Sequence, residues 1–283
     1  VTGANWGDLD KNGFKDLIVV GNWMGIRIFK NSSGQFKEDK QLEQYQGWWN
    51  SLAVDDVNGD GNLDLVAGNL GMNSKFKALE KEPMSIYIKD FDNNGTKECI
   101  TSIYREHQPY VFHLRPDLVG QLPTFKKRFL RYEDYAGKPF DEVFTDEMIE
   151  GAEVHHITHL NSAVFTGDSQ GKFSYKPLPA KSQLSSVNMI LVEDIDGDGL
   201  KEIILGGNFY GFKPEVGRLD ASFGEIYQLK KNAFTLMPNS KSGLYLNGQV
   251  RSAAVINGSG GRKYFLFGRN DDKLLAYTLN KRQ

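Results

Sequence analysis

Short apolar runs, and no long helical stripes, dominate the hydrophobic pattern of this chain. The runs at 17–20, 65–67 and 203–205 are continuous and do not alternate with polar residues. Such runs are typical of strands that are covered on both faces. Each run follows a loop rich in Asp, Asn and Gly, and each ends at a Gly-Asn pair. The pattern predicts an all-β fold built from hairpins with polar loops.

The polar loops repeat one nine-residue pattern four times, at 8–16 (loop 1), 56–64 (loop 2), 90–98 (loop 3) and 194–202 (loop 4). Oxygen-bearing side chains occupy positions 1, 3 and 5, glycine occupies position 6, and a carboxylate occupies position 9. The side chains at positions 1, 3, 5 and 9 are Asp8, Asp10, Asn12 and Asp16; Asp56, Asn58, Asp60 and Asp64; Asp90, Asp92, Asn94 and Glu98; and Asp194, Asp196, Asp198 and Glu202.

This spacing suits a hard cation. Ca²⁺ takes about 6–8 oxygen ligands, alternate residues of a tight loop can point inward together, and glycine permits the turn. By analogy with other loops of this spacing, a backbone carbonyl at position 7 would complete the shell, from Phe14, Asn62, Thr96 and Leu200. Without a cation, the 13 loop carboxylates, of 36 in the chain, would repel one another. We therefore predict up to four Ca²⁺ ions; solvated turns without metal are the alternative.

The positions of the loops predict how many structural units the chain contains. The number of residues between one loop and the next, for the first three loops, approximates the length of one four-stranded blade. A third blade would therefore start near 85–88. The longer interval before loop 4 carries apolar residues at helical spacing, which predicts a helical insert at about 114–150. Strands return at 162–165 and 173–175. A last unit, with strands at 250–256, 263–267 and 274–277, has no acids in its loop. We predict one β-propeller domain over 1–283 with about five blade units, either closed or part of a larger propeller.

Composition excludes several classes of partner. The formal net charge is −2, so no broad basic surface is available to neutralise nucleic-acid phosphates. The longest apolar runs fall far short of the roughly 20 residues of a membrane-spanning helix. Cys99 is the single cysteine, which rules out an internal disulfide, and we expect it at a buried strand position.

Several segments resemble those of one bacterial family: 47–52, 68–74, 115–118, 121–123, 126–127 and 217–221. They are similar to Bacteroidetes-type proteins with FG-GAP/VCBS repeats and an ASPIC/UnbV region, relatives of cartilage acidic protein. The resemblance implies an extracytoplasmic protein, secreted or an outer-membrane lipoprotein, of which this chain is a C-terminal propeller portion without established catalytic activity. The chain departs from the family in its acid-free last unit and in lacking the ASPIC/UnbV region.

Three further groups of residues are candidates for binding. Trp48 and Trp49 could stack on a sugar or a partner, or pack between blades. Tyr210, Glu215, Arg218 and Asp220 could form a recognition pocket, or an ion pair could brace their loop. The segment from His155 to His159 could hold zinc on a helix, but its β-branched residues favour a structural role.

These observations favour a calcium-stabilised scaffold that binds another surface or outer-membrane protein, and not an enzyme. The alternative is a lectin or a polysaccharide lyase, with a glycan as the partner. A lyase needs a general base beside charge-neutralising groups, and no such set is evident from spacing.

Overall fold

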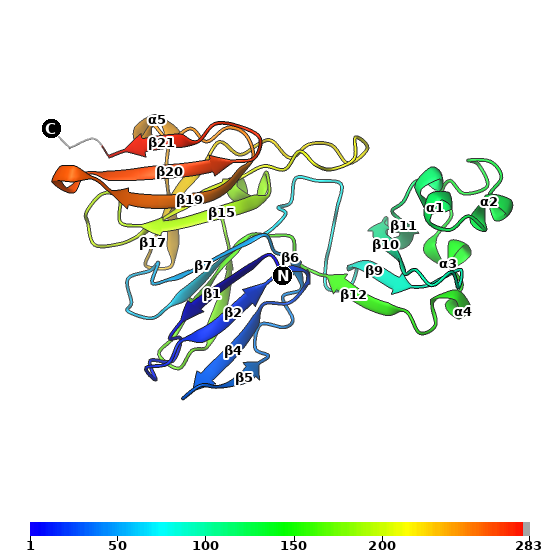
Figure 1. Ribbon diagram of the computed structural model, residues 1–283, viewed down its shortest axis with the longest axis horizontal. Coiled ribbons are helices and arrows are strands. Elements are labelled where there is room, and N and C mark those ends of the chain that lie inside the picture. Colours follow the sequence, from blue (N-terminus) through cyan, green and yellow to red (C-terminus); the bar gives the residue numbers. More distant parts are fainter. Residues whose placement is uncertain (280–283) are drawn as a thin grey trace. The chain divides into compact units, whose positions relative to one another are not determined.

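The computed structural model describes residues 1–279 as antiparallel sheets with a few short helices, which confirms the predicted all-β fold (Figure 1). The chain divides into two compact units. Unit 1 comprises Val1–Lys75 and the described residues from Leu160 onward, and unit 2 comprises Phe76–His159. None of the helices within residues 1–279 is both long and apolar enough to cross a membrane.

Unit 1 contains four sheets, each ordered mainly along the chain. Sheet 1 has β1 (Gly3–Gly7), β2 (Asp16–Val20), β4 (Arg27–Ser32) and β5 (Gln35–Asp39), and sheet 2 has β7 (Ser51–Asp55), β8 (Asp64–Gly68), β13 (Ala163–Gly167) and β14 (Phe173–Pro177). Sheet 3 has β15 (Val187–Glu193), β16 (Glu202–Gly207), β17 (Glu225–Lys230) and β18 (Ala233–Met237), and sheet 4 has β19 (Val250–Asn257), β20 (Lys263–Arg269) and β21 (Leu275–Thr278). A ribbon of β3 (Asn22–Met24) and β6 (Gly47–Trp48), the helix α5 (Asn239–Ser242), and the 3-10 turns Ala180–Gln183 and Ser259–Gly261 complete it.

The four sheets stand in a row, because the first strand of each packs against the next in the order β1, β7, β15, β19. Apolar side chains fill each space between neighbouring sheets. Every residue of β8 and β16 is buried, as expected for strands covered on both faces. β2 alternates between buried and half-buried residues, because sheet 1 stands at one end of the row. Closure of such a row into a propeller ring stays a prediction.

The glycine that ends the second strand has a packing role. A Cβ atom at Gly68 would collide with the carbonyl oxygen of Val187, at the start of the first strand of the next sheet. A Cβ atom at Gly207 would collide with the carbonyl oxygen of Ser186. The repeated Gly-Asn pairs therefore mark places where backbones approach closely.

Unit 2 combines one sheet with a small helical layer. The sheet order is β11-β10-β9-β12, from β9 (Met84–Lys89), β10 (Glu98–Arg105), β11 (Gln108–Val111) and β12 (Glu153–Ile157). The helices α1 (Arg115–Gln121), α2 (Phe125–Arg128), α3 (Phe140–Val143) and α4 (Asp146–Ile149) lie where the helical insert is predicted. Leu118, Phe125, Phe129 and Phe144 form its aromatic-rich core with Ile100 of β10.

Unit 2 interrupts sheet 2, and this differs from the predicted blade order. β8 pairs with β13, with Val66 opposite Val164, so the outer half of sheet 2 comes from beyond the insertion. Residues 85–88 and loop 3, predicted to start a third blade, therefore belong to the separate unit. The hairpin of β9 and β10 has the same strand, acidic loop and strand pattern as the other hairpins. Only the pairing of β9 with β12, which is distant in sequence, distinguishes it. The strands predicted at 162–165 and 173–175 are found as β13 and β14.

Cys99 lies on β10, but the prediction that it is buried was wrong. Its neighbours Glu98 and Ile100 point into unit 2, and strand alternation turns the Cys99 side chain outward, where it is exposed.

Candidate metal centres

The four acidic loops share one backbone geometry. The carboxylate at position 1 accepts a hydrogen bond from the N–H of the position 6 glycine in each loop. The N···O distances are 2.9 Å (Gly13 to Asp8), 2.8 Å (Gly61 to Asp56), 2.8 Å (Gly95 to Asp90) and 3.1 Å (Gly199 to Asp194). These four glycines have φ values of 87°, 83°, 89° and 87°, a left-handed conformation that glycine adopts without a steric penalty.

The carboxylate at position 9 anchors each loop to the second strand of its hairpin. It accepts a hydrogen bond from the N–H at position 2, at 3.2 Å (Leu9 to Asp16), 3.0 Å (Val57 to Asp64), 2.9 Å (Phe91 to Glu98) and 2.9 Å (Ile195 to Glu202). All four of these carboxylates are buried. The repeat thus places an ionisable group under every loop, where water is scarce.

The electrostatics of the loops favour a bound cation. Burial raises the pKa of Asp64 to about 6, and the charges of Asp60 and Asp56 add to this effect, although hydrogen bonds from Gly167 and Val57 oppose it. Burial likewise raises the pKa of Glu202, and the other loop 4 carboxylates add to the effect. A divalent cation among these oxygens would stabilise their ionised forms.

The oxygen atoms present fit Ca²⁺. At position 3, Asp10 Oδ1 and Asp92 Oδ1 are buried and have no hydrogen-bond partner. In loop 3, carboxylate oxygens of Asp90, Asp92 and Glu98 all lie within 4.8 Å of one another, and in loop 4 the same holds for those of Asp194, Asp196 and Glu202. Two ligands of one Ca²⁺ lie at most about 5 Å apart, since each Ca–O distance is roughly 2.3–2.6 Å. Loop 3 combines both features, an orphaned buried oxygen and three closely spaced carboxylates, and its donor set fits a calcium ion best.

Loop 1 differs from the others by a lysine from a neighbouring strand. Lys30 Nζ, on β4, lies 3.3 Å from Asp10 Oδ2 and 3.6 Å from Asp16 Oδ2. This ammonium group neutralises part of the charge that would otherwise attract a cation. The sequence pattern does not reveal it, because β4 is separate from the loop along the chain.

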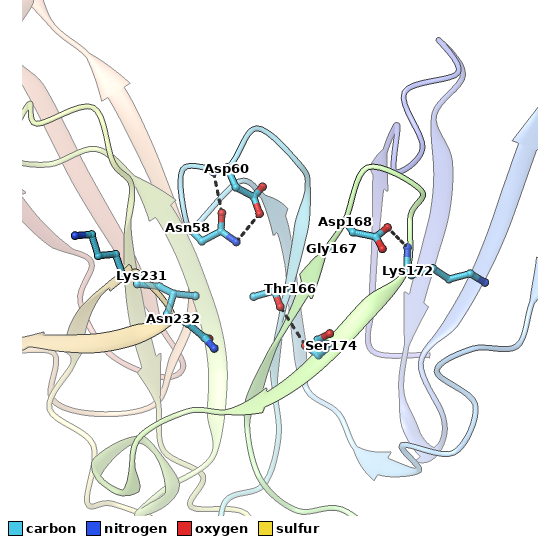
Figure 2. Close-up of a pocket in the computed structure, with 10 residues that line it drawn as sticks. Asn58, Asp60, Thr166, Gly167, Asp168, Lys172, Ser174, Lys231 and Asn232 are labelled. Atoms are coloured by element: carbon cyan, nitrogen blue, oxygen red, sulfur yellow. Dashed lines mark hydrogen bonds between the residues drawn. The ribbon is translucent and has the colours of Figure 1, made fainter.

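Loop 2 borders a polar pocket of about 480 Å³ (Figure 2). Asn58 and Asp60 of loop 2 lie on one side, and Asn58 Nδ2 donates a hydrogen bond of 3.0 Å to Asp60 Oδ2. The rest of the lining comes from β13, β14, the turn between them and the β17–β18 hairpin: Thr166, Gly167, Asp168, Lys172, Ser174, Leu229, Lys231 and Asn232. Two metal-ligand candidates therefore face a space that solvent can enter.

The two predicted tryptophan contacts have different environments. Trp49 is fully buried, its Nε1 donates a hydrogen bond of 3.0 Å to the Tyr45 carbonyl, and its ring packs edge-on against Phe165. This burial excludes Trp49 from ligand contact. Trp48 is half-buried and its ring lies 6.0 Å from that of Trp23. It lines a second pocket of about 390 Å³ that the sequence pattern did not reveal.

A cation–π contact braces the loop that follows β16. The guanidinium carbon of Arg218 lies 3.8 Å from the centroid of the Tyr210 ring. Within residues 1–279, no ion pair joins Arg218 to Glu215 or Asp220, so this contact replaces the ion pair considered from the sequence. Arg218 and Asp220 are exposed, and the Glu215 carbonyl accepts a hydrogen bond from Lys75 Nζ.

The histidines of unit 2 do not have the helical spacing of a zinc site. His155 and His156 are neighbours on β12, so their side chains point to opposite faces. His156 Nδ1 lies 2.9 Å from Ser85 Oγ, and His155 Nε2 lies 2.8 Å from Glu153 Oε1. These contacts agree with the structural role.

Comparison with known proteins supports the repeat. Residues 8–67 match a family model described as FG-GAP-like repeat. The match begins at the first residue of loop 1 and includes all of loop 2. A search of curated proteins finds no match. Among solved structures, the biofilm matrix protein Bap1 of V. cholerae is similar, with a TM-score of 0.30 and 9% identity. That alignment covers 99% of this chain and 63% of Bap1.

Proposed function

We propose that this chain is a calcium-binding scaffold of the β-propeller type that binds another protein outside the cytoplasm. Up to four Ca²⁺ ions would occupy loops 1 to 4 and hold the first and second strands of their hairpins together. The proposal includes that the chain is of the ASPIC/UnbV type. It also includes that the protein is either secreted or an outer-membrane lipoprotein. Millimolar calcium outside cells suits loops of modest affinity.

One observation carries the calcium assignment: the same loop geometry recurs four times, with buried carboxylate oxygens that lack partners at position 3 in two of the loops. Unpaired buried oxygens cost free energy, and a cation would offset that cost. Rigid sheets with exposed loops at their ends are a common platform for binding partners. The FG-GAP-like match over loops 1 and 2 agrees with this assignment.

The proposal excludes catalysis by the loop carboxylates. Those at position 1 and position 9 are held by backbone N–H groups of their own loops and face the proposed cation. A general base must instead reach a proton of the substrate. Incubation with acidic polysaccharides should therefore produce no unsaturated-sugar absorbance, and its appearance would establish a lyase.

The test of the calcium assignment is the melting temperature with Ca²⁺ and with a chelator. Each ion that binds only the native state adds about 2.7 kcal/mol at a free concentration 100 times its Kd. At roughly 2–4 °C per kcal/mol for a chain of this size, chelation should lower the Tm by about 5–11 °C for each bound ion. An unchanged Tm would contradict the assignment.

Two matched variants show whether the loops are responsible. Asp56→Asn removes one charge at position 1 of loop 2 and should lower the calcium stoichiometry by one ion in metal analysis. Glu147→Gln removes one charge from the exposed face of α4 and should leave the stoichiometry unchanged. Calcium-dependent co-purification of a membrane protein would then test the scaffold role, and a chain that retains nothing from native membranes would argue against it.

A further inference from the structure

The 390 Å³ pocket lies at the opposite end of unit 1 from loops 1, 2 and 4. Those loops follow β1, β7 and β15, whereas the pocket is lined by residues near the starts of β7, β15 and β19 and by segments that follow β2 and β16. Its volume is at the lower end of the range for small-molecule sites. The pocket is therefore separate from the proposed calcium sites.

Aromatic rings form one wall of this pocket. The Trp48 and Phe212 rings meet edge to face with centroids 5.9 Å apart, and Phe209 lies 4.7 Å from Phe212. Trp23 supports Trp48. The wall is an apolar surface on which a flat ligand can stack.

Arg251, the second residue of β19, supplies a positive charge to the pocket. One terminal nitrogen donates to the Asn208 carbonyl at 3.0 Å and the other to Gln249 Oε1 at 2.9 Å. The guanidinium carbon lies 5.5 Å from the Phe209 ring centroid. These bonds use two of its five N–H donors, and no carboxylate pairs with it in the described part of the chain. Burial lowers the pKa of Arg251, since no nearby acid compensates for the lost water.

Two asparagine amides add to the polar part of the lining, which also includes Ser186 and Asn188. The side chains of Asn22 and Asn50 make no hydrogen bond to the protein within residues 1–279. Each amide offers two donors and an acceptor. Such groups match hydroxyls, which both donate and accept.

We propose that this pocket binds an acidic saccharide. The ring of a uronic acid lies against Trp48, its carboxylate takes the remaining donors of Arg251, and its hydroxyls bond to Asn22 and Asn50. A guanidinium recognises a carboxylate with two parallel hydrogen bonds. The free amides and the small volume favour one or two sugar rings over an acidic peptide. This site goes beyond the calcium scaffold and does not depend on its protein partner.

The test is calorimetric titration of the whole chain in saturating Ca²⁺. Digalacturonate and glucuronic acid are the acidic probes, a glucose disaccharide is the neutral probe, and a short Asp-rich peptide is the competitor class. The acidic sugars should bind, and Arg251→Met should weaken them by about ten- to hundredfold, the range for a lost charged hydrogen bond. Arg251→Lys keeps the charge without the planar fork and should give an intermediate loss.

Trp48→Ala and Asn50→Ala provide variants that leave Arg251 and its internal contacts in place. Each should weaken the acidic sugars at least fivefold, and Asn50→Ala should do so with an unchanged melting curve. The proposal fails if the neutral sugar binds as well as the acidic ones, if none of the variants weakens binding, or if the peptide binds more tightly than the sugars. Loops 1 to 4 are filled in saturating Ca²⁺. Sugar binding that is present under this condition and is weakened by Arg251→Met therefore occurs at a site separate from these loops.

Discussion

Glu225 is a buried carboxyl group whose replacement should stabilise the protein in a pH-dependent manner. It begins β17, is 2% exposed, and its oxygens lie 3.3 Å and 3.4 Å from Ser222 Oγ. No ion pair reaches it among residues 1–279. Burial raises the pKa of Glu225 to about 7, while Lys181 and the Ser222 hydroxyl oppose the shift.

Glu225 destabilises the folded state at high pH, because its pKa is higher in the folded chain than in the unfolded chain. Below about pH 4.5, Glu225 is protonated in both the folded and the unfolded chain and costs nothing. Between about 4.5 and 7 the unfolded chain ionises first, so the folded state loses about 1.4 kcal/mol per pH unit. Above pH 7 the loss is complete, at about 3 kcal/mol. Glu225→Gln removes it and keeps a partner for Ser222.

The assay is denaturant unfolding of both proteins from pH 5 to pH 8.5 in saturating Ca²⁺. The loop carboxylates affect the pH dependence of unfolding equally in both proteins. The measured quantity is therefore the difference in the free energy of unfolding between Glu225→Gln and the unmodified chain. That difference should be below about 1 kcal/mol at pH 5 and should rise to a plateau of about 3 kcal/mol above pH 7, or roughly 6–12 °C in Tm. A difference that does not change with pH, or a less stable variant at pH 8, would show that ionisation of buried Glu225 does not destabilise the fold.

Two further substitutions test packing and loop charge. Lys30→Gln should tighten the calcium affinity of loop 1 by about tenfold in calorimetry, because removing one charge at this distance is worth on the order of 1–2 kcal/mol; the same change at exposed Lys37 should have no effect. Gly68→Ala should cost at least about 2 kcal/mol in denaturant unfolding, because its Cβ meets the Val187 carbonyl. Gly120→Ala, whose Cβ meets nothing within 4 Å on α1, should be neutral or stabilising, and equal effects of the two would show that close approach is not the cause.

The loops and their strands could be predicted because both are local. A repeat that places Asp8, Gly13 and Asp16 at fixed spacing encodes its own turn, and the apolar run that follows encodes the buried strand. The insertion could not be predicted, since loop 3 has the same spacing and only the pairing of Val66 with Val164 reveals where sheet 2 continues.

The environments of the candidate binding residues could not be predicted, because segments that are distant in sequence create them. Trp48 and Trp49 are adjacent in sequence, yet one lines a pocket and the other is buried beside Phe165. Arg251 lies some 200 residues from Trp48, and no periodicity links them. Lys30 reaches loop 1 in the same way, from a strand that pairs with β2.

The divided origin of sheet 2 bears on how a nascent chain acquires its structure. β7 and β8 emerge from the ribosome well before β13, so the free edge of β8 waits, with its apolar Leu65–Ala67 stretch unpaired, while residues 76–159 are synthesised. Joining such distant strands costs loop-closure entropy that grows with the logarithm of the intervening length. Early compaction of the intervening segment shortens that effective length. If the aromatic helical layer folds slowly, the unpaired edge of β8 stays available to pair with other chains. Aggregation is then most probable, and chaperone binding is most useful, before β13 is synthesised.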